Sequence, residues 1–202
     1  MFLVLEGIDG SGKTTLIAHV ITPLLQELYA HKVITYTREP GGSAVAEELR
    51  RVMMHNELDT FSLLLLMMAA RCDHLNKLIN PALKQNKIVV CDRFNYSTIA
   101  YQHYGFGVDI GLINTLTQSL PQPIYEPITI YLDISPQLAR ERMKGRASNK
   151  FDDLSLGFYS RVRAGYLYAM RDDKNVLYVD SSLPFSAMSL RIQEFLSKVT
   201  TE

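Results

Sequence analysis

Residues 6–15 read Glu6-Gly-Ile-Asp-Gly-Ser-Gly-Lys-Thr-Thr15, and the part from Gly7 to Thr14 matches the pattern G-x-x-x-x-G-K-[ST]. An apolar run at 2–5 precedes the motif and a helical pattern begins at Lys13. This strand–loop–helix context is the one that a phosphate-binding loop requires. One residue is unexpected, because Asp9 places a carboxylate inside a loop built to bind anions.

The residues of this loop suit phosphate binding. Glycine at 7, 10 and 12 lets the backbone turn tightly and point its N–H groups at an anion. The N-terminus of the following helix adds positive charge. Lys13 is expected to reach the β- and γ-phosphates, and Thr14 to bind a magnesium ion. Nucleotide binding is therefore the first functional prediction.

Short apolar runs alternate with helical patterns along the chain, which is typical of an α/β fold with a parallel sheet. Pro23 is expected to kink the first helix or to mark a turn within it. We predict a five-stranded parallel sheet with helices on both faces, and one domain over 1–202. The expected strands are 2–5, 33–37, 88–91, 128–132 and 176–179, and the expected helices are 13–28, 44–54, 60–78, 97–104, 110–120, 136–143, 152–170 and 185–199.

The composition is that of an ordinary globular protein, with 202 residues, 47% apolar, 21% charged and a formal net charge of zero. A neutral chain does not favour nucleic acid or an anionic membrane as a partner, and the longest apolar run, 63–70, is too short to span a bilayer. Cys72 and Cys91 lack metal or disulfide spacing, and no secretory signal is recognised, so a cytoplasmic protein is expected. Surface or helix-end positions are expected for the five histidines, which are His19, His31, His55, His74 and His103.

Further charged residues indicate phosphoryl transfer to a second small molecule. Asp92 and Arg93 end the third predicted strand, at the edge of the sheet that carries the phosphate loop. The carboxylate suits magnesium, and the guanidinium suits a second phosphate. A basic stretch is expected to form a lid, within about 140–152, whose cations stabilise the transferred group; a solvated basic helix face is the alternative. This stretch contains Arg140, Arg142, Lys144, Arg146 and Lys150.

Residues 149–152 spell N-K-x-D, the guanine-binding motif of GTPases. That motif should follow a buried strand, whereas a polar stretch precedes it here. No D-x-x-G follows a strand either, since Asp92 is followed by Arg93. We interpret the match as chance. A nucleotide-dependent switch or binding protein is the alternative from another functional class.

Together these residues resemble the thymidylate kinase family, which phosphorylates dTMP to dTDP with ATP. The resemblance implies a P-loop nucleoside-monophosphate kinase of the bacterial type, with Gly10 in the loop and the catalytic arginine in the lid. It also implies Mg²⁺ with ATP, and a homodimer formed through helices. The apolar face at 61–68 is compatible with such a dimer or with the core. The resemblance covers almost the whole chain and rests on EGIDGSGKTT at 6–15, TREPGG at 37–42, AEELR at 46–50, AAR at 69–71, DRFNYSTIAYQ at 92–102, YLD at 131–133 and KFDD at 150–153.

The resemblance also implies residue roles. Asp9 would accept a hydrogen bond from the 3′-hydroxyl of dTMP, Arg140 would lie against adenine, and 180–182 would belong to the adenine pocket. The implied dTMP-binding residues are Asp9, Arg38, Glu39, Pro40, Arg50, Met67, Arg71, Arg93, Thr98, Tyr101 and Gln102. Those implied for ATP are Gly7, Ile8, Asp9, Gly10, Ser11, Gly12, Lys13, Thr14, Thr15 and Arg140. The implied catalytic residues are Lys13, Asp92, Arg93 and a lid cation, Arg146 or Arg142, with Thr14 and Asp92 as metal ligands.

Some of these residues have simpler interpretations when taken singly. Arg71 could be a side chain at a helix end, Tyr101 could belong to the core, and Glu39 could pair with Arg38. Met67 departs from the family, which usually has a phenylalanine stacking on thymine there; a thioether gives a softer contact. We expect dTMP to remain the best acceptor, and a different or broader set of deoxypyrimidine monophosphates is the alternative.

Overall fold

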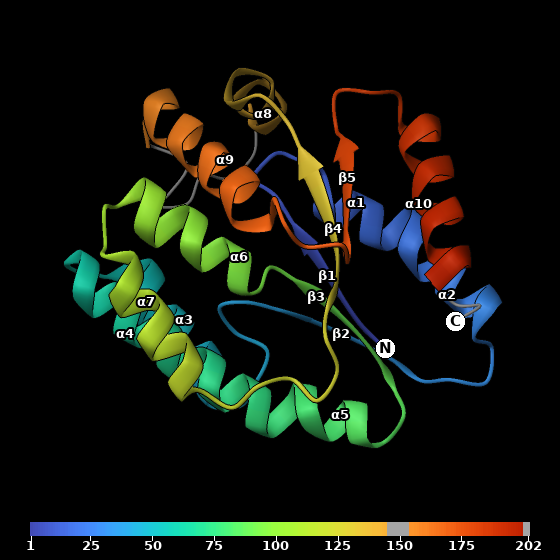
Figure 1. The fold of residues 1–202 in the computed structure, drawn as a ribbon, viewed down its shortest axis with the longest axis horizontal. Coiled ribbons are helices and arrows are strands. Elements are labelled where there is room, and N and C mark those ends of the chain that lie inside the picture. The colour runs from blue at the N-terminus through green and yellow to red at the C-terminus, as the bar shows by residue number, and fades with distance from the viewer. Residues whose placement is uncertain (145–153, 200–202) are drawn as a thin grey trace.

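The computed structural model describes residues 1–144 and 154–199 (Figure 1). Its centre is a five-stranded parallel sheet in the order β2-β3-β1-β4-β5. The predicted α/β fold is thereby confirmed. The strands are β1 Phe2–Glu6, β2 Ile34–Arg38, β3 Ile88–Asp92, β4 Ile128–Asp133 and β5 Val176–Asp180.

Every strand ends one residue later than its apolar run predicts, and each added residue is charged. The ladder continues through these residues because backbone pairing does not depend on side-chain polarity. Arg38 of β2 and Leu5 of β1 both pair with Asp92 of β3. The charged ends of parallel strands therefore meet at one edge of the sheet, where ligands bind in such folds.

The helices cover both faces of the sheet (Figure 1). Several begin at side-chain caps, such as Asp59, whose carboxylate accepts hydrogen bonds from the N–H groups of Phe61 and Ser62. In the described part of the chain, no helix combines the length and apolarity needed to cross a bilayer. The helices are α1 Lys13–Leu16, η1 Ile17–Ile21, α2 Thr22–Leu28, α3 Ala44–His55, α4 Thr60–His74, η2 Leu75–Ile79, α5 Asn80–Lys84, α6 Asn95–Thr98, η3 Ile99–Gly105, α7 Ile110–Ser119, α8 Pro136–Met143, α9 Leu156–Met170 and α10 Phe185–Val199.

The first helix keeps its predicted bounds of 13–28, and two other helix ends differ from the predictions by more than two residues. The first helix runs through Pro23 without a break. Proline has no N–H to donate within the helix, and the wider π-turn η1 that precedes it accommodates the missing hydrogen bond. The helix predicted to end at residue 78 continues through η2 and α5 to Lys84. The helix predicted to begin at residue 152 begins at Leu156 in the structure, where the Ser155 hydroxyl caps it by accepting a hydrogen bond from the Phe158 N–H at 3.1 Å.

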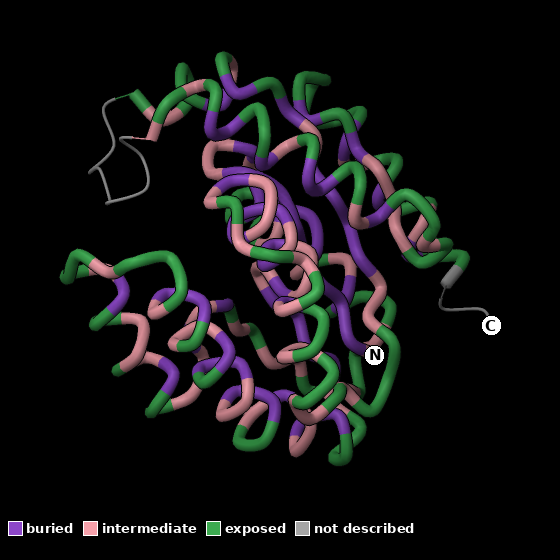
Figure 2. Tube along the Cα trace, turned by 60° about the vertical axis from the view of Figure 1, so that its left-hand side comes forward, coloured by how far each residue is buried: buried purple, intermediate pink, exposed green. Residues whose placement is uncertain are grey.

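Alternation along the strands divides the core between the two faces of the sheet. Leu3 and Leu5 of β1 pack with the buried residues of α1, η1, α2 and α10. Phe2 and Val4 point the other way and pack with η2 and α5. Figure 2 shows buried segments gathered at the centre of the molecule. The central strands β1, β3 and β4 are buried along most of their length, whereas the edge strands β2 and β5 are partly exposed. Burial on both faces explains why the central strands are mostly apolar in sequence.

Candidate active site

The loop between β1 and α1 has the backbone of an anion-binding nest. Gly10 and Gly12 have φ angles of 81° and 94°, in a region that glycine adopts without strain. A Cβ on Gly10 would lie 2.5 Å from the carbonyl oxygen of Ala139 in α8. The loop therefore passes too close to α8 for any side chain. Gly12 directly precedes the helix that begins at Lys13, so the helix N-terminus adds its positive end to the nest.

Lys13 is buried beneath this loop. Its Nζ donates hydrogen bonds to the carbonyl oxygens of Gly7 at 2.9 Å and Ile8 at 3.3 Å, and lies 3.9 Å from Asp92 Oδ1. Burial, and then the nearby charge of Arg93, lower the pKa of Lys13, while Asp92 acts in the opposite direction. The ammonium group is thus bound to groups that arriving phosphate oxygens can replace.

Thr14 and Asp92, the expected magnesium ligands, come from neighbouring strands: Asp92 is the last residue of β3, and Thr14 lies in the helix that follows β1 and its loop. Thr14 is exposed in the first turn of the helix. The Oδ1 atom of Asp92 is buried and has no hydrogen-bond partner among residues 1–144 and 154–199. A carboxylate oxygen left without a donor fits a divalent cation, and Mg²⁺ takes its remaining ligands from phosphates and water. The residues present therefore fit a magnesium-bound nucleotide.

Arg93 is a largely buried cation directly after β3, and several groups fix its position. Its Nη2 donates to Asp9 Oδ1 and its Nη1 to the Tyr166 hydroxyl, each at 2.9 Å. The φ angle of 74° at Arg93 is uncommon outside glycine and indicates a backbone held by its surroundings. Burial alone would lower the pKa of Arg93, but Tyr101 and Asp9, with other neighbours, outweigh it and raise the pKa well above its usual value.

Glu6 holds the backbone that follows Arg93. Its carboxylate accepts hydrogen bonds from the Phe94 N–H at 2.9 Å, the Ser97 N–H at 3.1 Å and the Ser97 hydroxyl at 2.6 Å. Burial raises the pKa of Glu6 above its usual value, although the hydrogen bond from Ser97 opposes the shift. Glu6, Ser97 and Tyr166 were not predicted as parts of the site. A signal was available in the charge of Glu6 at the end of an apolar run.

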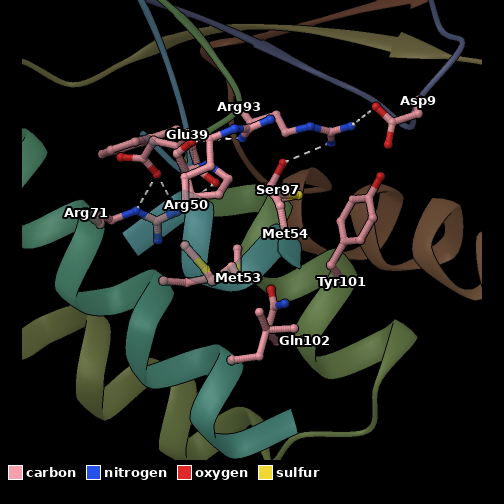
Figure 3. Close-up of a pocket in the computed structure, with 14 residues that line it drawn as sticks. Asp9, Glu39, Arg50, Met53, Met54, Arg71, Arg93, Ser97, Tyr101 and Gln102 are labelled. Atoms are coloured by element: carbon pink, nitrogen blue, oxygen red, sulfur yellow. Dashed lines mark hydrogen bonds and ion pairs between the residues drawn. The ribbon is translucent and has the colours of Figure 1, made fainter. Parts of the chain in front are cut away.

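A pocket opens beside Arg93 (Figure 3). At its far end Arg71 donates from Nε to Glu39 Oε2 at 2.7 Å and from Nη2 to the Phe94 carbonyl oxygen at 3.1 Å. Arg71 is only 5% exposed, so the simpler interpretation of a solvent-reaching helix end is wrong. Glu39 does not pair with Arg38, which pairs with Glu47 at 3.1 Å. Of the residues expected to bind dTMP, the pocket is lined by Asp9, Glu39, Pro40, Arg50, Met67, Arg71, Arg93, Tyr101 and Gln102.

Part of the pocket lining is apolar and includes three methionines. Met53 and Met54 come from α3, and Leu63 and Met67 from α4. These residues were not predicted, apart from Met67, because α3 and α4 meet only in the folded chain. The Gln102 Oε1 atom is buried without a hydrogen-bond partner in the described ranges. An unpaired acceptor in an apolar pocket is a candidate contact for a polar ligand edge.

Several expected site residues lie elsewhere or are already engaged. Thr98 is buried but does not line the pocket. Arg38 lines a separate open depression with Glu47, and Arg50 donates to the Pro40 carbonyl oxygen at 2.9 Å.

Two of the cations of the expected lid, Arg140 and Arg142, belong to α8. Arg140 donates to the Leu154 carbonyl oxygen at 2.9 Å. Arg142 donates to the hydroxyl of Ser181 at 3.0 Å and to its carbonyl oxygen at 2.7 Å. The Ser181 hydroxyl in turn donates to the Ser11 carbonyl oxygen at 2.6 Å, which ties this arginine to the loop. Arg146, Lys150 and the N-K-x-D segment at 149–152 lie outside the described residues.

The expectation of a surface or helix-end position is wrong for His74. The helix continues into η2, and the His74 side chain is fully buried. Its Nδ1 lies 3.1 Å from Glu39 Oε1 and its Nε2 lies 2.7 Å from Thr37 Oγ1. The spacing of three residues from Arg71 was an available signal, because it places both side chains on one helix face.

The comparisons with known proteins agree with this geometry. The thymidylate kinase family model matches residues 5–192. The chain is 45% identical to the thymidylate kinase of Wolbachia pipientis wMel over 166 residues, 82% of this chain and 83% of the relative. It is 37% identical to that of Kosmotoga olearia over 203 residues, 97% of this chain and 95% of the relative. The solved structure of thymidylate kinase from Ehrlichia chaffeensis superposes with a TM-score of 0.78 at 35% identity, covering 98% of each chain. The chain therefore belongs to the thymidylate kinase family.

Proposed function

We propose that this protein transfers the γ-phosphoryl group of ATP to the phosphate of dTMP, giving ADP and dTDP. The observation that carries the proposal is the position of the Arg93–Asp9 pair between two sites, the phosphate loop on one side and the methionine-walled pocket on the other. Membership of the thymidylate kinase family supports the same donor and acceptor.

On the donor side, the loop's N–H groups would hold the β- and γ-phosphates. Lys13 would exchange its bonds to the Gly7 and Ile8 carbonyl oxygens for bonds to phosphate oxygens. Thr14 and Asp92 would hold Mg²⁺, directly or through water, and the ion would neutralise charge on the phosphates.

On the acceptor side, Arg93 would bind the dTMP phosphate and Asp9 would accept a hydrogen bond from the 3′-hydroxyl. The base would enter the apolar part of the pocket, with Arg71 and Gln102 addressing its edge. The acceptor phosphate is already an anion at neutral pH, so the transfer needs no strong general base. Catalysis then consists of alignment and charge neutralisation.

We further propose that residues 1–202 act as one catalytic unit, with a lid within about 140–152 that supplies a cation. Arg146 and Arg142 are the two candidates. Closure of such a segment would exclude water that otherwise hydrolyses the donor.

A coupled assay of ADP release, run with ATP and each nucleoside monophosphate in turn, tests the function. We expect dTMP to give the highest kcat/KM. If none of the monophosphates is phosphorylated and the protein binds a partner protein in a nucleotide-dependent way, the switch alternative is favoured instead. Preference for GTP as the donor would revive the interpretation of residues 149–152 as a guanine-binding motif.

A broader acceptor set is the second candidate, and the pocket wall favours considering it. Met53, Met54 and Met67 are flexible thioethers, which adapt to shape more readily than an aromatic ring. The test is to measure kcat/KM for a panel of deoxynucleoside monophosphates with the wild type and with Met67→Phe. A tenfold preference for dCMP or a modified deoxypyrimidine nucleotide over dTMP would establish this alternative.

We also propose that two copies associate through the α3 and α4 side of the molecule. Val45 and Val52 of α3 and Phe61 and Leu65 of α4 are 41–53% exposed, whereas Leu64 of the same predicted face is fully buried. The 61–68 run therefore serves both core and surface. Sedimentation of wild type and Phe61→Glu would test the dimer, which the charged variant should dissociate.

A further inference from the structure

His74 makes two hydrogen-bond contacts deep under the acceptor pocket. The imidazole is fully buried. Its Nδ1 faces Glu39 Oε1 at 3.1 Å, and its Nε2 faces Thr37 Oγ1 at 2.7 Å. It does not line the pocket itself, but Glu39 and Arg71 do. His74 therefore contacts a residue of the pocket wall, Glu39, from outside the pocket.

The chemistry of these partners fixes the proton on the imidazole. A carboxylate oxygen can only accept, so Nδ1 must carry the hydrogen that it shares with Glu39. The Thr37 hydroxyl can donate or accept, so it satisfies Nε2 in either state. Glu39 is then held at both oxygens, with His74 on Oε1 and Arg71 on Oε2.

We propose that His74 is a positioning residue of the acceptor site, which holds the Glu39 carboxylate and, through it, the Arg71 guanidinium against the edge of the acceptor base. The inference rests on the proposed function, because it assigns the pocket to a nucleoside monophosphate.

Burial makes this support necessary. Glu39 is 7% exposed, and a buried carboxylate is costly unless each oxygen is paired. Burial by itself would raise the pKa of the Glu39 carboxyl, but Arg71 and the hydrogen bond from His74 outweigh it and hold the pKa below its usual value. Without His74, Oε1 loses its donor, and the carboxylate is free to turn away from Arg71.

The loop that carries Glu39 also lies on the imidazole. Gly42 has a φ angle of 91°, and a Cβ there would collide with His74 Nε2 and Thr37 Oγ1. The segment 39–42 therefore follows the surface of His74 closely. One side chain thus supports both the carboxylate and the loop that presents it.

Three substitutions of His74 distinguish the contributions of its two ring nitrogens. Asn places an amide nitrogen where Nδ1 lies and keeps the donor to Glu39. Gln reaches the position of Nε2 and keeps only the contact to Thr37. Leu keeps neither. We expect His74→Leu and His74→Gln to raise KM for dTMP by about tenfold to a hundredfold, with KM for ATP unchanged, and His74→Asn to restore most of the loss.

His55→Asn is the matched control, because His55 also bonds through Nδ1, to the Arg51 carbonyl oxygen, but on the exposed part of α3. We expect it to behave as wild type. Thermal unfolding of every variant corrects for loss of folded enzyme. A merely structural role would lower the active fraction equally in all three His74 variants and leave KM for dTMP unchanged, and this result would overturn the inference.

A measurement without substrate completes the test. Long-range ¹H–¹⁵N NMR of the His74 ring should show a protonated Nδ1 in the wild type and a changed Nδ1 shift in Glu39→Gln. An unprotonated Nδ1, or an unchanged shift, would overturn the inference even if dTMP kinase activity is intact. If the NMR result is as expected but no monophosphate is phosphorylated, the proposed function fails while the link from His74 to Glu39 stands.

Discussion

The Arg93 guanidinium donates a 2.9 Å hydrogen bond to the Asp9 carboxylate, joining the end of β3 to the phosphate loop. This pair explains the carboxylate within an anion-binding loop. In the proposed function, the backbone N–H groups of the loop and Lys13 would bind the donor phosphates, whereas the Asp9 side chain is paired with Arg93, a cation that lines the acceptor pocket. The ten residues 6–15 would then contribute to both substrate sites.

Asp9→Asn should impair the use of dTMP far more than the binding of ATP. The amide keeps the shape of the side chain but removes the charge that orients Arg93. We expect KM for dTMP to rise by about tenfold to a hundredfold, as for loss of a charged hydrogen bond. Steady-state kinetics with each substrate varied in turn measure the split.

The control for this variant is Asp109→Asn, which removes an aspartate that caps α7 outside the pocket. We expect near-wild-type kinetics from it. An Asp9 variant that weakens ATP and dTMP equally would assign Asp9 to the donor site instead.

Lys13→Met should abolish most turnover without unfolding the protein. The substitution removes the lysine that would neutralise charge on the phosphates in the transition state, so we expect kcat to fall by about a thousandfold or more. The pKa of Lys13 is lowered by burial and by Arg93, which means that the folded state disfavours this charge. The melting temperature should therefore stay the same or rise.

Calorimetry and a coupled ADP assay provide the two measurements for Lys13→Met. Lys32→Met is the control, because Lys32 bonds Asn86 on the surface. Retained turnover in the Lys13 variant would refute the assigned role.

Arg146→Ala and Arg142→Ala should differ in their kinetic signatures. Arg142 is bound to Ser181, which is bound to the Ser11 carbonyl oxygen, so its loss should raise KM for ATP by loosening the phosphate loop. Arg146 is the other candidate for the lid cation, and its loss should then lower kcat more than it raises KM for dTMP.

Arg171→Ala, which removes an exposed arginine that stacks on Tyr168, should leave both parameters near wild type. A kcat unchanged in Arg146→Ala but strongly reduced in Arg142→Ala would exchange the two assignments.

Glu39→Gln should change the acid sensitivity of folding. The pKa of Glu39 is lowered from its usual value of 4.5, because Arg71 and His74 outweigh the effect of burial. The unfolded state therefore binds the proton more readily, and the stabilisation is fully present above about pH 4.5 and is lost as the pH falls through the lowered pKa.

Urea unfolding of wild type and Glu39→Gln from neutral pH to about pH 3 checks this sign. The difference in unfolding free energy should be constant above about pH 4.5 and shrink below it. In an Arg71→Met background, the pKa of Glu39 in the folded state should lie closer to its unfolded value, so the part of the difference that is lost in acid should be smaller. A difference that stays constant into acid would contradict the assignment.

Local sequence was sufficient for the phosphate loop and for the number of strands. The glycines that the loop backbone requires and the Lys13–Thr14 pair all lie within eight residues of sequence. Strands that are buried on both faces are recognisable because they must be apolar. The strand ends were predicted one residue short because Glu6, Asp92 and the other terminal charges are polar. Their polarity serves the ligand edge, whereas their backbone still belongs to the ladder.

The tertiary structure alone decided what surrounds the pocket. The buried position of His74, the Glu6–Ser97–Tyr166 contacts and the methionine wall all join segments far apart in the chain. No local pattern distinguishes a histidine on a helix face that will be covered from one that will not. The sequence by itself determined a nucleotide-binding α/β chain, because loop chemistry and strand burial are local requirements. Which side chains complete the acceptor site depends on packing between α3, α4 and η3, and packing exists only in the folded protein.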